Sequence, residues 1–72
     1  MSRISRPKFR IINLLGDMEM AAEENDSAEV CALAQTAREL LEGYPEREWK
    51  AKKALGQQID ELETALISEL EA

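Results

Sequence analysis

The last third of the chain carries an apolar repeat of helical spacing that no turn sequence interrupts. Its members recur every three or four residues and are Ala51, Leu55, Ile59, Leu62, Leu66 and Leu70. Side chains spaced in this way lie along one side of an α-helix. Pro45 suits the first turn of such a helix, because its missing N–H is not needed there. We therefore expect one helix over residues 45–71, about 42 Å long if it continues to the final residue.

The same segment has a second apolar face. Trp49, Gly56 and Ile67 lie roughly 120° around the helix from the first stripe. Two apolar faces require two neighbours, and a glycine costs up to about 1 kcal/mol in a helix interior. We therefore expect a backbone or an aromatic ring to approach Gly56 closely. The predicted protein interface consists of Trp49, Leu55, Gly56, Ile59, Leu62, Leu66, Ile67 and Leu70.

A shorter stripe near the start of the chain predicts a helix over residues 8–24. Its members are Ile11, Leu15, Met18 and Ala22. Phe9 and Ile12 lie off this stripe, so the helix should be central or pinned between two neighbours. Residues 9–15 also suit a β-strand by their β-branched content. Helix is the preferred alternative, because the sequence offers no second strand for pairing.

Residues 27–42 have the cleanest amphipathic pattern in the chain. The apolar positions are Val30, Leu33, Ala34, Ala37, Leu40 and Leu41. Asp26 is placed to cap the amino end, with Glu29 three residues later in the arrangement of a capping box. Gly43 is expected to end the helix in the left-handed conformation. The connection to the first helix is so short that the two should form an antiparallel hairpin.

The predicted fold is all-α, with a helical hairpin followed by a longer third helix. These helices form one domain over residues 8–72, after a flexible basic arm over residues 1–7. The third helix either closes a three-helix bundle or opens to form a helix-swapped or antiparallel dimer. A chain of 72 residues buries only about 60% of its unfolded surface, so its core is marginal. Association compensates for this in many small domains, and we expect a homodimer.

The sequence contains few residues suited to catalysis or metal binding. It has no histidine and one cysteine, Cys31, so an intrachain disulfide is excluded and a zinc site lacks ligands. The acids do not have the spacing of a calcium loop. Without histidine the commonest general base is missing, and Cys31 is expected to be a small packed core residue. We expect no enzymatic activity, no cofactor and no metal.

The sequence shows no recognisable targeting or membrane-spanning segment. No apolar run approaches the roughly 20 residues that cross a bilayer. The apolar stretch that follows Arg6 is interrupted by Lys8 and Arg10, unlike that of a secretory leader. A single thiol is typical of a reducing compartment. We expect a soluble cytoplasmic protein without a membrane partner.

Charge is distributed unevenly along the chain. The net charge is −6, yet the first ten residues hold four bases and no acid. These bases are Arg3, Arg6, Lys8 and Arg10. They could follow a phosphate backbone, which makes a nucleic-acid-binding accessory protein the alternative function. Because the rest of the chain is strongly acidic, we favour an arm that is disordered or folds onto acids.

The end of the predicted third helix is acidic, and no base follows Lys53. The acids beyond that point include Asp60, Glu61, Glu63, Glu69 and Glu71. Acids at a carboxyl end oppose the helix dipole, so a basic partner is expected. A second copy crossing antiparallel could supply Lys50, Lys52 and Lys53. The leading hypothesis is a non-enzymatic protein-binding module: a small regulator, inhibitor or assembly factor that presents this acidic surface to a larger protein.

Overall fold

The computed structural model describes residues 6–71, with side chains from Lys8 onward, and over that range the chain is all-α. Its elements are α1 (Arg6–Glu23), α2 (Ser27–Glu42), a short 3₁₀ helix η1 (Glu46–Glu48) and α3 (Trp49–Glu71). The helices pack together as a small bundle, which confirms the predicted fold class.

The first helix extends further toward the amino terminus than expected. α1 begins at Arg6, two residues before the expected start, because Pro7 falls in its first turn, where its missing N–H is not needed. Residues 9–15 lie inside this helix, so the helical alternative is confirmed and the strand alternative is wrong. Residues 1–5 of the expected arm lie outside the described part of the chain.

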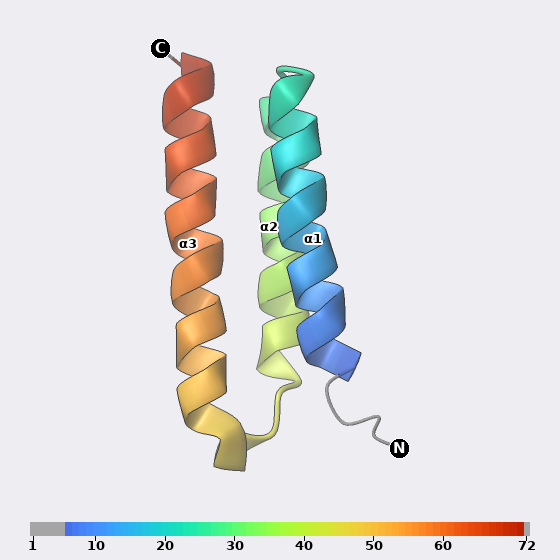
Figure 1. The fold of residues 1–72 in the computed structure, drawn as a ribbon, viewed down its shortest axis with the longest axis vertical. Coiled ribbons are helices and arrows are strands. Elements are labelled where there is room, and N and C mark those ends of the chain that lie inside the picture. Colours follow the sequence, from blue (N-terminus) through green and yellow to red (C-terminus); the bar gives the residue numbers. More distant parts are fainter. Residues whose placement is uncertain (1–5, 72) are drawn as a thin grey trace.

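The three helices form an up-down-up bundle (Figure 1). α1 and α2 are antiparallel neighbours, and α3 returns alongside α2 so that it runs in the same direction as α1. Each helix contacts the other two, with the α1–α2 hairpin the most extensive pair. The chain thus closes on itself, in the first of the two arrangements expected for the third helix.

The connection between α1 and α2 serves both helices. Asn25 has a left-handed φ of 59°, and the N–H of Asp26 donates to Ala21 O at 3.0 Å, which ends α1 in a Schellman motif. The Asp26 side chain accepts from the Glu29 N–H at 3.1 Å, so the predicted N-cap of α2 is confirmed. In a full capping box the Glu29 side chain would accept from the Asp26 N–H, but here that N–H already donates to Ala21 O.

The connection between α2 and α3 differs from the sequence prediction at two points. Gly43 ends α2 with φ −84°, not in the left-handed region, and its N–H donates to Leu40 O at 3.1 Å. A left-handed residue is not needed there, because Pro45 already disfavours helix at Tyr44. Pro45 is extended, with ψ 137°, and the turn after it is η1, so α3 begins at Trp49 and not at residue 45.

The core combines large side chains with small ones. Its buried members are Ile11, Met18, Ala21, Val30, Ala34, Ala37, Tyr44, Leu55 and Ile59. α2 contributes mostly small residues, and its Ala34 and Ala37 have no exposed surface. These small side chains of α2 let α1 and α3 approach it closely. The core therefore fills without long side chains from all three helices.

Candidate functional site

The long stripe of α3 is packed within its own chain. Leu55 and Ile59 are buried, and Leu62, Leu66 and Leu70 are half-buried against the same core. These residues of the predicted interface thus serve as contacts between helices of one molecule. Leu55 and Ile59 retain almost no exposed surface for a second chain.

The second face of α3 meets α2 at Gly56. A methyl group built on Gly56 would lie 3.3 Å from Leu41 Cδ2. The close neighbour of Gly56 is therefore an aliphatic side chain, and the prediction of a backbone or an aromatic ring at this position is wrong. Ile67 is half-buried on this face, whereas Trp49 is 58% exposed at the start of the helix.

Two of the predicted surface acids on α3 are paired within the molecule. The Arg38 guanidinium of α2 donates through Nη2 to Asp60 Oδ1 at 2.8 Å, and also to Glu63 Oε1. The hydrogen bond with Glu63, and then that with Asp60, raises the pKa of Arg38. The sequence prediction missed this pairing, because Arg38 is more than 20 residues from either acid along the chain. The sequence feature that could have indicated this pairing is that Arg38 is the single base of α2, whose other charged residues are acids.

Six exposed acids from separate segments of the chain gather at one end of the bundle. Figure 1 shows that the carboxyl ends of α1 and α3 lie at the same end as the α1–α2 connection. We call this end the acidic pole, and define it by six exposed residues: Glu23, Glu24, Asp26, Glu29, Glu69 and Glu71. Neither α1 nor α3 has a base in its last turn. Glu61, the remaining predicted surface acid, is exposed on α3 nearer its middle.

Apart from Arg38, the described bases lie in the opposite half of the molecule. They are Lys8, Arg10, Arg47, Lys50, Lys52 and Lys53. Of the predicted basic arm, Lys8 and Arg10 are exposed on the first turns of α1. Arg6 is the first residue of α1, and its side chain is not among those described. Arg3 lies outside the described residues.

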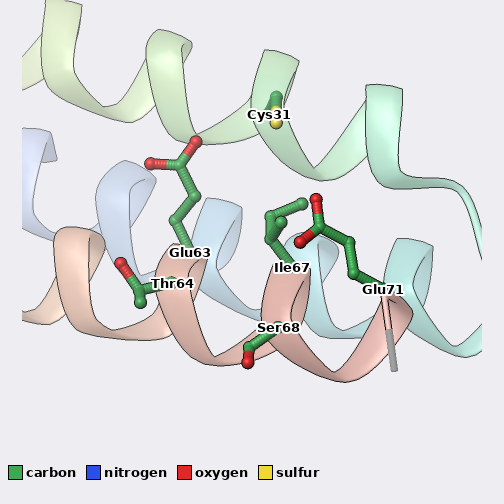
Figure 2. Close-up of a pocket in the computed structure, with 6 residues that line it drawn as sticks. All are labelled: Cys31, Glu63, Thr64, Ile67, Ser68 and Glu71. Atoms are coloured by element: carbon green, nitrogen blue, oxygen red, sulfur yellow. The ribbon is translucent and has the colours of Figure 1, made fainter.

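A shallow groove of about 480 Å³ runs between α2 and α3 beside the acidic pole. Its lining consists of Cys31, Glu63, Thr64, Ile67, Ser68 and Glu71 (Figure 2). Ile67 points toward α2 between the carboxylates of Glu63 and Glu71, which lie one helical turn on either side of it. The groove therefore offers a half-buried apolar side chain flanked by two acids.

Cys31 lies across this groove on α2 and is exposed, so its prediction as a packed core residue is wrong. It follows the buried Val30 directly, and one residue corresponds to about 100° around a helix. This rotation carries the thiol out of the core and onto the rim of the groove.

The outer face of α1 is open, although this helix was expected to be central or pinned between two neighbours. Phe9 and Ile12 are 65% and 43% exposed. The packed face of α1 includes Ile11 and Met18, which have no exposed surface. α2 and α3 both contact α1, but they leave the side of Phe9 uncovered.

Among residues 6–71, no group of three or more cysteines and acids is arranged to hold a metal ion. None of the described helices has the length and apolar character needed to cross a bilayer. A scan against protein-family models and searches of curated proteins and of solved structures found no match.

Proposed function

We propose that the chain is a non-enzymatic protein-binding module whose acidic pole receives a basic segment of a larger protein. As a small regulator, inhibitor or assembly factor, it would act by occupying that segment. The observation that supports this is the convergence of acids from three helices at one end of the bundle, with all the described bases elsewhere.

Helix dipoles strengthen the negative potential of this pole. The carboxyl end of a helix carries roughly half a negative charge. Two such ends, those of α1 and α3, lie here without a base in either last turn. A concentrated field of one sign steers a partner of opposite charge and suppresses partners of like charge. The partner segment should therefore be rich in lysine or arginine.

The groove beside the pole gives such a segment an apolar contact. A lysine or arginine can pack its aliphatic stem on Ile67 while its charge reaches the Glu71 carboxylate. Glu63 is held by Arg38, so Glu71 is the groove acid left to receive the charge. A basic amphipathic segment satisfies both features of the groove.

The test uses a fluorescent amphipathic peptide of lysines and leucines as the probe. In one variant, Glu24→Gln, Glu69→Gln and Glu71→Gln remove three charges from the pole. In the matched control, Glu39→Gln, Glu42→Gln and Glu46→Gln remove three exposed charges from the opposite end. We expect the pole variant to bind the probe roughly tenfold more weakly, and the control to bind as the wild type does.

Added salt should weaken wild-type binding more than binding by the pole variant, because fewer charges contribute in the variant. Equal weakening by the two triple variants would show that binding follows net charge alone and would contradict the proposal. Binding of labelled duplex DNA that is lost in a Lys8→Gln, Arg10→Gln chain would favour the nucleic-acid alternative.

A further inference from the structure

The side of α1 that points away from the core carries a band of exposed apolar residues. Phe9, Ile12 and Met20 are 65%, 43% and 62% exposed. At 3.6 residues per turn they fall on one face, opposite Ile11 and Met18 of the core. Large apolar side chains aligned along an exposed helix are typical of a surface that contacts another helix.

Gly16 lies in the middle of this band. A methyl group built on it would meet no atom within 4 Å, so no contact within the molecule requires glycine there. Glycine disfavours a helix interior, and its position on the band removes side-chain bulk where a second helix would cross. The band therefore has bulky side chains toward both ends and, at Gly16, a position without a side chain between them.

The charges beside the band are complementary to a second copy of themselves. Arg10 and Asp17 are two turns apart on one flank of the band, while Lys8 and Glu19 are three turns apart on the other. A two-fold axis perpendicular to an antiparallel helix pair brings each flank against the same flank of the other copy. Each base then faces an acid of the second copy. A parallel pair would instead place like charges together.

We propose that the outer face of α1 is a homodimer interface. Two copies cross antiparallel with the two-fold axis near residues 13–14, so that Gly16 of each faces Ile12 of the other. Phe9 of each packs against Met20 of the other. Arg10 pairs with Asp17 of the second copy, and Lys8 pairs with Glu19. The two acidic poles then point to opposite ends of the dimer, which keeps their charges apart.

This dimer differs from the one expected from the sequence, which crosses two third helices. The seam of α3 is already filled by its own chain, with Leu55 and Ile59 buried, whereas Phe9 and Met20 are exposed. The band also excludes the six acids of the acidic pole. The dimer therefore does not depend on the proposed binding of a basic segment.

Sedimentation equilibrium over a concentration series up to about 1 mM measures the dimer dissociation constant. Arg10→Glu places like charges opposite Asp17 at two symmetric positions, and we expect the dissociation constant to rise roughly tenfold. Asp17→Arg should have the same effect. A chain with both changes restores opposite charges across the axis, so its dissociation constant should return to within roughly threefold of the wild-type value.

Lys53→Glu is the matched control, since it makes the same charge change on the exposed side of α3. It leaves the α1 dimer unchanged but would weaken a dimer of third helices. Circular dichroism checks that each variant keeps its helix content. The proposal is overturned by a chain that is monomeric throughout the series, or by weakening with Lys53→Glu and not with Arg10→Glu. Failure of the double variant to recover also overturns it.

Discussion

α1 and α3 both carry apolar residues on two faces, but the fold covers these faces differently. On α3 the second face lies against α2 at Gly56, where Leu41 fills the space, and only Trp49 at the start of the helix is largely exposed. On α1 the second face points away from the core and leaves Phe9 and Met20 more than half exposed. The two patterns are similar in the sequence. Periodicity therefore identifies an apolar face but does not identify what covers it.

The two helices also differ in how their charges are used. α3 is tied to α2 through Arg38, which bonds to both Asp60 and Glu63. Among the described residues, no ion pair joins α1 to another helix. Asp60 and Glu63 of α3 thus contribute to holding the bundle together, whereas the charges of α1 are available to a partner.

The largest expected effect separates the covered face from the open one. Ile59→Ala removes a side chain with no exposed surface and should lower the free energy of unfolding by about 2–5 kcal/mol. Phe9→Ala removes a larger side chain but should change it by no more than about 0.5 kcal/mol, because Phe9 is already exposed to water. Urea unfolding at dilute protein concentration measures both.

Ile59→Val keeps the comparison usable if the alanine variant does not fold. It should lower the free energy of unfolding by about 0.5–1.5 kcal/mol. If Phe9→Ala were as destabilising as Ile59→Ala at dilute concentration, the outer face of α1 would be covered within the monomer, and the contrast between the two helices would be wrong.

The two helical glycines give the next contrast. Gly16→Ala should raise the free energy of unfolding by about 1 kcal/mol, because alanine favours helix and its methyl group meets no neighbour. Gly56→Ala brings the same helix propensity, but its methyl group lies 3.3 Å from Leu41 Cδ2, so Leu41 must shift. We expect a clearly smaller gain or none. Equal gains in thermal unfolding would show that α2 does not constrain Gly56.

The ion pairs of α3 should contribute less. Arg38→Gln leaves the Glu63 carboxylate half-buried without its charged partner and should cost roughly 0.5–1 kcal/mol, with a smaller cost at high salt. Arg47→Gln, which removes an exposed base from η1, is the control and should change stability little. An identical loss at low and high salt would show that Arg38 acts through packing and not through charge.

The smallest effect concerns the connection that attaches α3. Burial, and to a lesser extent the Glu48 carboxylate, raises the pKa of Tyr44. The folded-state pKa is therefore above that of the unfolded chain, which is about 10. The stability from the neutral phenol is complete below pH 10 and is lost as the pH rises through the folded-state pKa. Tyr44→Phe should flatten this part of the alkaline stability profile, measured by urea unfolding at successive pH values.

Much of the fold could be predicted from local signals. The apolar stripes located all three helices, and Asp26 was identified as a cap because its side chain needs to reach only three residues along the chain. Predictions that depended on several competing local preferences were less accurate. Gly43 did not become left-handed, and the turn after Pro45 became 3₁₀, because a proline beside a helix end changes which hydrogen bonds can form.

The candidate site was harder to predict, since its residues come from separate helices. The acids of α3 were visible in the sequence, but their division into paired and unpaired groups depends on Arg38 of α2. Cys31 was predicted in the core because it borders the apolar stripe of α2, but it is exposed. One position along a helix is a rotation of about 100°, which is enough to move a side chain from the core to the surface.

The sequence by itself determined the three amphipathic helices, the Asp26 N-cap and the excess of acid, because hydrogen bonds and side-chain periodicity within a helix depend on near neighbours. Only the tertiary structure decided which apolar face is covered and which is open. It also brought the acids of α1, α2 and α3 to a common pole. These features depend on distances between residues far apart in the chain, which packing of the helices sets.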